Sequence, residues 1–228
     1  MSFKIGIDVG GTFTDFLLVD AEGNPEIYKV LSTPDDPSVA VMTGLGEMAK
    51  EKGMAVSSFL NSVDIIVHGT TVTTNAVLTG KVAKTGLLTT KGFRDALQMR
   101  RGIREELYNN RYLPPPPLVP RYLRVPVEER VDYSGKIVKQ IVLHDVDKGI
   151  DLFKAEGVEA VAVCFMHAYA NTENESRAAE LVAQRLPGTY LSVSSEILPQ
   201  IRFYDRVSTT VLNSAVGPLL RDYLMALT

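Results

Sequence analysis

The sequence contains few of the residues that build disulfide frameworks or transition-metal clusters. Its one cysteine, Cys164, excludes a disulfide scaffold and any zinc site made of cysteines. Of its three histidines, His68, His144 and His167, no two stand at the spacing of metal ligands. Cys164 also lies within an apolar, strand-like run, which predicts a buried structural thiol.

Strong charge of one sign and long apolar runs are also missing. Lys and Arg total 24 and Asp and Glu total 27, so the net charge of the 228-residue chain is −3. This balance excludes an obvious nucleic-acid-binding protein or a polybasic membrane binder. No stretch approaches the roughly 20 apolar residues of a membrane span, and no signal peptide is visible. With 45% hydrophobic residues, we expect a globular cytoplasmic protein with no nucleic-acid or membrane partner.

The first fifty residues predict a strand meander followed by a helix. Residues 3–9 alternate apolar and polar side chains with a period of two, which is typical of a strand. Two further strands are expected over 12–20 and 26–31, separated by turn-forming residues. Apolar residues at helical spacing predict an amphipathic helix over 38–52. The chain therefore does not open with a strand that feeds directly into a helix.

The second half of the sequence alternates helices and strands. Helices are expected over 145–156 and 172–186, and the second has the Thr172–Glu175 spacing of a capping box. Strands are expected over 158–165 and 190–193, and this order favours a parallel sheet. Shorter elements are expected in the middle of the chain: strands at 65–67 and 87–88, and helices at 74–78 and 93–99.

Prolines dominate the segment 114–126 and exclude a helix or a central strand there. We interpret it as an extended excursion across the surface, because Val119 and Leu123 are among its apolar side chains that can be buried. A flexible linker between two domains is the alternative.

The strongest functional signal is the string DVGGTFTD, at the end of the first strand. It consists of a carboxylate, two glycines, two hydroxyls and a second carboxylate: Asp8, Gly10, Gly11, Thr12, Thr14 and Asp15. Glycines let backbone N–H groups approach a phosphate closely, and hydroxyls add donors. A buried Asp8 would need compensation, which Mg²⁺ with its waters would supply. The pattern favours a phosphate-binding loop, and a plain hairpin turn is the alternative.

Two further segments contain candidate binding residues. His68, Thr70, Thr71 and Asn75 follow the strand at 65–67, at the end of a strand where α/β sheets place ligands. The alternative for this segment is a helix N-cap beside a histidine of the core.

Arg94 and Arg101 belong to a basic cluster and present planar guanidinium groups that suit a carboxylate or phosphate. A solvated helix face is the alternative for them. His167 points either into a cleft or toward a hydrogen-bond partner on a neighbouring helix.

The string GIDVGGTFTDFLLVD resembles the first phosphate loop of the actin–hexokinase–Hsp70 ATPase superfamily. In this longer form it is similar to the N-terminus of the hydantoinase A, 5-oxoprolinase and ketone carboxylase family. Five further segments occur in the order of that family: 68–80, 85–102, 118–138, 160–175 and 192–218. The resemblance therefore covers essentially the whole chain.

The resemblance implies an α/β fold: the ribonuclease-H-like N-terminal lobe of an actin-like ATPase, with a mixed sheet flanked by helices. It implies a hydantoinase/oxoprolinase N-terminal domain over 1–200 and the truncated start of a second lobe over 201–228. The stretch 202–213 at this junction is either an inter-lobe hinge or a plain helix start. Members of the family are several times longer and have a second phosphate loop, whereas Gly10–Gly11 is the only Gly-Gly pair here. We therefore expect no independent ATP turnover by this chain.

The resemblance also implies an ATP-dependent hydrolase, of the N-methylhydantoinase or 5-oxoprolinase type, that activates a cyclic amide oxygen by phosphoryl transfer. ATP and Mg²⁺ are the implied cofactors. It implies that Asp8 is a magnesium ligand and that Asp8, Thr12 and Asp15 are catalytic. It implies phosphate contacts from Gly10, Gly11, Thr12 and Thr14. The implied substrate contacts come from His68, Thr70, Thr71, Asn75, Arg94 and Arg101.

The implied partners are a small-molecule substrate (a hydantoin, 5-oxoproline or a ketone) and a second, hydantoinase B-like subunit or domain. The first alternative is a subunit of an acetone or acetophenone carboxylase, in which an enol oxygen is phosphorylated before carboxylation. A non-catalytic assembly module is the second. A sugar kinase of the same superfamily is weaker, because the motifs after residue 68 do not resemble that branch.

Overall fold

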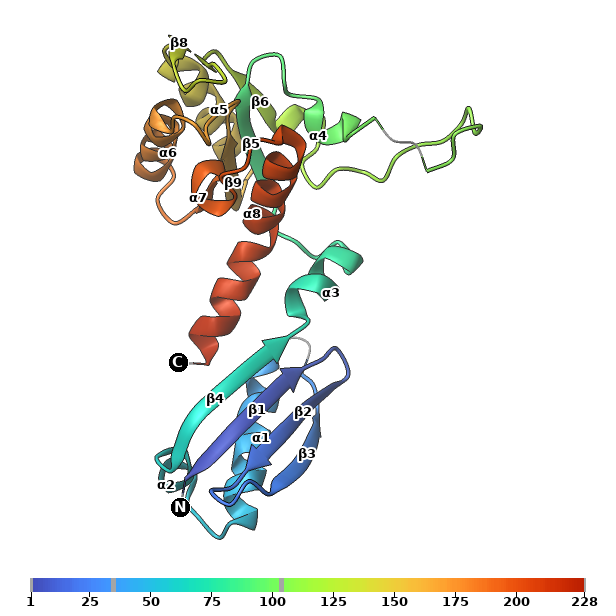
Figure 1. Cartoon of the computed structure of the whole chain (residues 1–228), viewed down its shortest axis with the longest axis vertical. Coiled ribbons are helices and arrows are strands. Elements are labelled where there is room, and N and C mark those ends of the chain that lie inside the picture. Colours follow the sequence, from blue (N-terminus) through green and yellow to red (C-terminus); the bar gives the residue numbers. More distant parts are fainter. Residues whose placement is uncertain (1, 34–35, 103–104, 228) are drawn as a thin grey trace. The chain divides into compact units, whose positions relative to one another are not determined.

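The structure is a computed structural model that describes residues 2–33, 36–102 and 105–227. Its contacts divide the chain into two compact units, drawn with their elements in Figure 1. Unit 1 comprises Met1–Lys81 and Leu219–Thr228, and unit 2 comprises Val82–Pro218. The predicted domain boundary between residues 200 and 201 falls within unit 2 and stays a prediction.

A four-stranded sheet of order β3-β2-β1-β4 forms the centre of unit 1. Strand β1 (Phe3–Val9) pairs antiparallel with β2 (Phe13–Val19), which pairs antiparallel with β3 (Pro25–Leu31). Strand β4 (Val63–Thr70) lies on the other side of β1 and runs parallel to it. The predicted meander and mixed sheet are confirmed. Strand alternation gives the sheet one buried face, which helix α1 (Pro37–Glu51) covers.

Helix α1 begins at a clear capping signal. The Asp36 side chain accepts a hydrogen bond from the Ser38 backbone N–H at 3.0 Å, and Pro37 occupies the first turn, where its missing N–H has no cost. The helix packs so closely on the sheet that a Cβ at Gly44 would lie 2.2 Å from the Phe16 ring. The next helix, α2 (Val56–Leu60), was not predicted, because only Phe59 of its five residues is buried.

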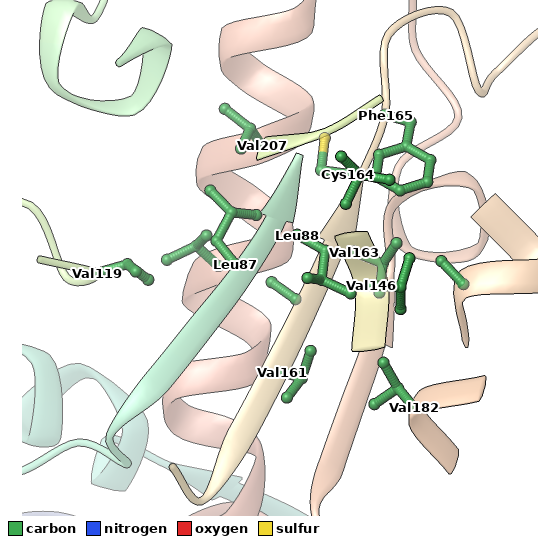
Figure 2. Close-up of a cluster of buried hydrophobic side chains, with 14 of the residues drawn as sticks. Leu87, Leu88, Val119, Val146, Val161, Val163, Cys164, Phe165, Val182 and Val207 are labelled. Carbon is green, nitrogen blue, oxygen red and sulfur yellow. The ribbon is translucent and has the colours of Figure 1, made fainter. Parts of the chain in front are cut away.

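The sheet of unit 2 has the order β10-β9-β5-β6, and all of its strand pairs are parallel. The strands are β5 (Thr85–Thr90), β6 (Arg124–Val127), β9 (Ala160–Cys164) and β10 (Tyr190–Val193). All residues of β5 and β9 are buried, as expected for central parallel strands. Figure 2 shows the apolar core around them, including Cys164, whose thiol has its pKa raised to about 12 by burial. The predicted parallel sheet is confirmed.

The remaining helices and short elements complete the two units. They are α3 (Val72–Thr79) in unit 1, α4 (Ala96–Met99), η1 (Arg121–Leu123), β7 (Arg130–Val131), β8 (Ile137–Lys139), α5 (Leu143–Ala155), α6 (Glu173–Arg185) and α7 (Ser194–Ile197) in unit 2, and α8 (Phe203–Ala226), which has residues in both. The division between the units within α8 falls at Pro218, which lacks the N–H of a helix hydrogen bond. None of the helices among the described residues has the length and hydropathy of a membrane span.

The proline-rich segment is part of unit 2. Val119 and Leu123 are fully buried in its core, which confirms the prediction that this excursion buries apolar side chains. Pro126 lies in β6 at the edge of the described sheet, opposite Thr89. An edge strand tolerates proline because one of its sides makes no ladder hydrogen bonds.

The predicted capping box at Thr172 is wrong. The Thr172 side chain makes no capping hydrogen bond, and Glu175 is fully buried instead of reaching back to the helix start. Its carboxylate accepts hydrogen bonds from the Phe165 N–H at 2.9 Å, the Ser194 hydroxyl at 2.6 Å and the Ser195 N–H at 2.9 Å. Glu175 therefore joins three chain segments of unit 2, and a spacing rule within one helix cannot predict that.

A second buried carboxylate, Glu129, makes the stability of unit 2 depend on pH. It is 3% exposed and accepts hydrogen bonds from the Thr90 hydroxyl and, at 2.9 Å, from the Asn174 amide. Burial raises the pKa of Glu129 above its ordinary value of 4.5, although both hydrogen bonds oppose the shift. The folded protein therefore holds this proton more tightly than the unfolded chain, and the resulting stability is lost as pH rises above 4.5 through the folded pKa.

We therefore expect Glu129→Gln, which is neutral at every pH, to gain stability relative to the wild type as pH rises. Urea unfolding between about pH 4 and pH 8 measures this difference. Glu128→Gln is the matched control with the opposite sign. Because Lys139 lowers the pKa of Glu128, the free energy of unfolding of this variant should fall relative to that of the wild type as pH rises through the acid range. If the free energies of unfolding of the wild type and Glu129→Gln differ by the same amount at every pH, the raised pKa of Glu129 is contradicted.

Candidate phosphate-binding site

The turn between β1 and β2 requires glycine. The Gly10 N–H donates a hydrogen bond to the Phe13 carbonyl at 3.0 Å, which closes the turn. A Cβ at Gly10 would lie 2.9 Å from that same carbonyl oxygen, closer than side chains approach a backbone oxygen. The N–H groups of Gly11 and Thr12 make no hydrogen bond with any residue that the structure describes. Two adjacent free N–H groups in a tight turn are a ready anion-binding arrangement.

Ser32, the residue that follows β3, holds this loop in place with two hydrogen bonds. Its hydroxyl donates to the Gly10 carbonyl at 2.8 Å, and its N–H donates to the Thr12 carbonyl at 2.9 Å. The hydroxyl of Thr14 lies 3.0 Å from that of Ser32, and the Thr14 side chain is fully buried. Thr14, predicted as a phosphate ligand, therefore supports the loop from the covered face of the sheet. Nothing in the sequence around Ser32 indicated its role.

The threonine-rich segment after β4 is attached directly to the loop. The Thr71 N–H donates to the Val9 carbonyl at 3.1 Å, and the Thr70 hydroxyl accepts a hydrogen bond from the Val72 N–H at 3.1 Å. The Asn75 amide donates to the Thr71 hydroxyl at 3.3 Å, and a Cβ at Gly11 would lie 3.2 Å from the Asn75 amide nitrogen. The structure therefore brings the two predicted segments together.

His68 has a partner that the sequence did not reveal. Its Nε2 is hydrogen-bonded to the hydroxyl of Tyr223, in the part of α8 that belongs to unit 1. Burial lowers the pKa of His68, and the negative charge of Asp8 opposes this shift. The contact with Tyr223 favours the alternative of a satisfied structural histidine, so a substrate role for His68 stays a prediction.

A cavity of about 690 Å³ opens beside the loop. Four of the predicted residues line it: Gly10, Gly11, Thr12 and Asn75. The sequence did not indicate several polar neighbours that share this lining: Ser32, Thr33, Asp36, Lys81, Asp222 and Tyr223. All of the lining belongs to unit 1. A cavity of this size with free backbone donors at its wall suits a phosphate-bearing small molecule.

Asp8 and Asp15 lie directly opposite each other in the pairing of β1 with β2. Asp8 is exposed, which corrects the expectation that it is buried, and Asp15 is half-exposed and forms an ion pair with Lys29 at 2.9 Å. Directly opposed side chains have Cβ atoms roughly 4.5–5.5 Å apart, and two like charges there destabilise the sheet. Among the described residues no group of three or more His, Cys, Asp or Glu side chains could hold a metal. The pair fits a cation such as Mg²⁺, which takes few protein carboxylates and keeps waters and phosphate oxygens.

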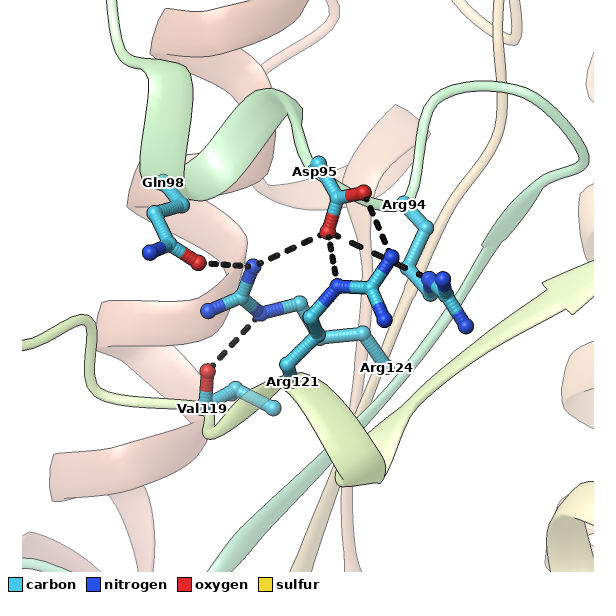
Figure 3. A network of polar contacts seen from close by, with 6 residues as sticks. All are labelled: Arg94, Asp95, Gln98, Val119, Arg121 and Arg124. Carbon is cyan, nitrogen blue, oxygen red and sulfur yellow. Dashed lines mark hydrogen bonds and ion pairs between the residues drawn. The ribbon is translucent and has the colours of Figure 1, made fainter.

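The two predicted arginines belong to unit 2 and have acidic partners there. The Arg94 guanidinium lies 3.9 Å from the Asp95 carboxylate, and Arg121 donates to both oxygens of Asp95 at 2.9 and 3.0 Å. These contacts lower the pKa of Asp95 and are drawn in Figure 3. Arg101 pairs with Asp205 at 2.5 Å. Their substrate contacts stay predictions, because each arginine already has a structural partner.

Comparison with known proteins assigns the chain to a family. Residues 4–186 match the family described as the hydantoinase/oxoprolinase N-terminal region. The chain belongs to this family. The hydantoinase/oxoprolinase N-terminal region thus accounts for both units, since the match starts within β1 of unit 1 and ends in unit 2.

Individual relatives confirm the family and its fold. The chain is 37% identical to caprolactamase subunit alpha of Pseudomonas jessenii, over 97% of this chain and 32% of that one. It superposes on the crystal structure of the ATP-dependent caprolactamase from the same organism with a TM-score of 0.90, 37% identity, and the same two coverages. It superposes on a nucleotide-free structure of acetone carboxylase with a TM-score of 0.87 and 27% identity, over 99% of this chain and 34% of that one. The chain spans about a third of the length of these relatives.

Proposed function

We propose that unit 1 binds the phosphates of ATP and that the chain is the N-terminal ATP-binding region of an enzyme of the hydantoinase/oxoprolinase family. The observation that carries this proposal is the pair of free N–H groups, of Gly11 and Thr12, at the wall of the cavity. The printed description of the caprolactamase structure as ATP-dependent supports it. Phosphates bind where several backbone N–H groups converge, because those donors need no reorientation.

In this proposal, the residues around the loop have separate tasks. Gly11 and Thr12 donate to phosphate oxygens, Asn75 lies beside Gly11 to extend the donor set, and Ser32 and Thr14 hold the loop in shape. Asp8 would hold Mg²⁺, with Asp15 across the strand pair as its neighbour. When bound, the ion supplies positive charge that offsets the charge of the phosphates.

We propose that the reaction is the hydrolysis of a cyclic amide. The γ-phosphoryl group of ATP passes to the amide oxygen and ADP leaves. Water then adds to the ring carbon and the C–N bond breaks, which gives a free amine and an acyl phosphate. A second water hydrolyses the acyl phosphate to a carboxylate and phosphate. Positioning and electrostatic stabilisation contribute more than covalent catalysis in such transfers. Similarity to a protein named caprolactamase, a name that denotes a lactam substrate, supports this class over the other members of the family.

Similarity to the acetone carboxylase structure supports a second candidate function, a subunit of a ketone carboxylase. There the phosphoryl acceptor would be an enol oxygen, and the activated carbon would take up bicarbonate-derived CO₂. Phosphate release by the protein assembled with its partner subunit distinguishes the two candidates. Lactams or hydantoins stimulate it in the first case, and ketones with bicarbonate do so in the second. The name "subunit alpha" of the caprolactamase relative supports the requirement for a partner.

Titration calorimetry of Mg·ATP and Mg·ADP into the 228-residue chain tests the phosphate site. We expect Gly10→Ala to weaken nucleotide binding by about tenfold or more, because the added Cβ pushes against the Phe13 carbonyl and moves the two donors that follow. Gly46→Ala is the matched control: a Cβ there meets nothing within 4 Å, and alanine suits its position within α1. A wild-type chain that binds neither nucleotide, or a Gly10→Ala variant that binds as well as wild type, would contradict the proposed loop.

A further inference from the structure

The sheet of unit 2 has its own cluster of polar and aromatic residues, which the proposed function does not use. Strands β6, β5 and β9 are parallel, so the residues that follow them lie at one edge of the sheet. Arg130 follows β6, Phe93 follows β5 and His167 follows β9. Open α/β sheets bind their ligands at this carboxyl edge.

Ring contacts connect this edge to the first turn of α8. The Arg130 guanidinium lies 5.2 Å from the centre of the Phe93 ring, and Phe93 meets Phe203 edge-on with ring centres 5.5 Å apart. The Arg206 guanidinium lies 5.5 Å from the ring of Phe203 and 5.6 Å from that of Tyr169. The two arginines therefore belong to one connected set of aromatic contacts.

His167 completes this set and combines two unfavourable features. Its ring meets Tyr169 edge-on, with centres 5.9 Å apart. Its backbone has a φ of 59°, in the left-handed region that is uncommon for residues other than glycine, although histidine adopts it more often than most. Its Nδ1 is buried and has no hydrogen-bond partner among the described residues. We call the connected residues the His167 cluster: Phe93, Arg130, His167, Tyr169, Phe203 and Arg206.

The positive charges of the two arginines in the cluster are not balanced by ion pairs. Neither forms an ion pair within the part of the chain that the structure describes. Arg206 is fully buried, and it donates to the Ser194 hydroxyl and to two backbone carbonyls, which uses three of its five N–H groups. Burial and then the charges of Arg130 and Arg206 lower the pKa of His167, which favours the neutral ring. A buried arginine and a half-buried one, neither with an ion pair, favour an anionic ligand.

The acidic groups near the cluster either have other hydrogen-bond partners or are disfavoured in their charged forms. Asp132, the one acid that raises the pKa of His167, accepts hydrogen bonds from the Ser134 hydroxyl and N–H and from the Lys136 N–H. Burial raises the pKa of both Glu129 and Glu175, which disfavours their charged forms. The positive charge of the two arginines is therefore only partly offset.

We propose that the His167 cluster binds a small organic carboxylate with an apolar body. Half-buried Arg130 meets the carboxylate, and His167 donates from Nδ1 to one of its oxygens. Fully buried Arg206 adds positive charge from beside the rings of Phe203 and Tyr169. The three aromatic rings of the cluster contact the apolar part. This site lies wholly within unit 2 and does not depend on the nucleotide site proposed in unit 1.

Calorimetric titration of the 228-residue chain with sodium benzoate tests the proposal, with benzamide as the uncharged probe of the same shape. We expect benzoate to bind and benzamide to bind at least about tenfold more weakly, because only the carboxylate pairs with Arg130. Arg130→Gln should weaken benzoate binding by about tenfold or more. Arg185→Gln is the matched control, since Arg185 is in unit 2 but is paired with Asp147 and Asp151 on the α5–α6 surface. Absence of benzoate binding, or equal binding of benzamide, would overturn the proposal.

His167→Gly separates a binding role from a packing role. Glycine adopts a φ of 59° without strain, so this variant should melt at the same temperature as the wild type or above it, while benzoate affinity falls by about tenfold or more. A lower melting temperature together with unchanged benzoate binding would show that His167 only packs, against the proposal. Asp8→Asn should leave benzoate binding unchanged, so failure of the nucleotide site and failure of this site are distinguishable.

Discussion

Asp8→Asn is expected to remove most of the Mg²⁺ dependence of nucleotide binding. Asparagine keeps the shape of the side chain but loses the charge that a hard divalent cation requires. Removing even a hydrogen-bond partner of a metal ligand costs roughly 10–100-fold in metal affinity, so losing the carboxylate itself should cost at least as much. Calorimetry of ADP with and without Mg²⁺ measures this: the wild type should gain affinity from the ion, and the variant should gain little.

The same substitution should leave the fold intact or make it more stable. Asp8 is exposed and faces Asp15 across the strand pair, so neutralising it removes a like-charge repulsion. Loss of metal-dependent binding therefore cannot be attributed to unfolding. Glu22→Gln, in the turn between β2 and β3, is the control that changes the net charge of the same unit by the same amount. If Asp8→Asn and wild type respond equally to Mg²⁺, Asp8 is not the metal ligand.

The sequence predicts the main elements of both units because their patterns are local. Period-two alternation identifies β1 over the residues that the structure assigns to it, and apolar residues at helical spacing place both ends of α1 within one residue of the structure. Helix α7, with four residues, has no such pattern of its own. Helix α8 confirms the helix start expected over 202–213, and its full length was not predicted because Pro218 interrupts the helical sequence signal.

The phosphate loop was predictable for the same reason, since its glycines, hydroxyls and carboxylates are consecutive. Its supports were not predictable, because Ser32 and Tyr223 reach the loop and His68 from distant parts of the chain. Thr14 illustrates the limit of motif reasoning: its hydroxyl has suitable chemistry, but strand alternation places it on the covered face. Asp8 and Asp15 share the open face by that same alternation, so the register of β1 with β2 decides which residues of the string can meet a ligand.

Replacement of Arg206 by methionine is expected to cost unit 2 the most stability of any single change considered. The guanidinium is fully buried and donates to the Phe165 carbonyl at 2.6 Å, the Gln200 carbonyl at 2.6 Å and the Ser194 hydroxyl at 3.1 Å. Through Ser194 it is linked to the buried carboxylate of Glu175. Methionine fills part of the volume but makes none of these hydrogen bonds, and the buried Phe165 carbonyl keeps only the longer bond from the Ala168 N–H at 3.4 Å.

We expect Arg206→Met to lower the free energy of unfolding by about 3–5 kcal/mol, the range for removing one partner of a buried charged network. Urea unfolding measures the change, and Arg202→Met is its control, because Arg202 is exposed and the same replacement there should cost less than about 0.5 kcal/mol. Glu175→Gln combined with Arg206→Met should recover part of the loss, because burial disfavours the ionised form of Glu175 and, without Arg206, that form has no cation nearby. Without that recovery, the stability supplied by Arg206 would come from its bonds to the two carbonyls alone, and Ser194 would not couple Arg206 to Glu175 energetically.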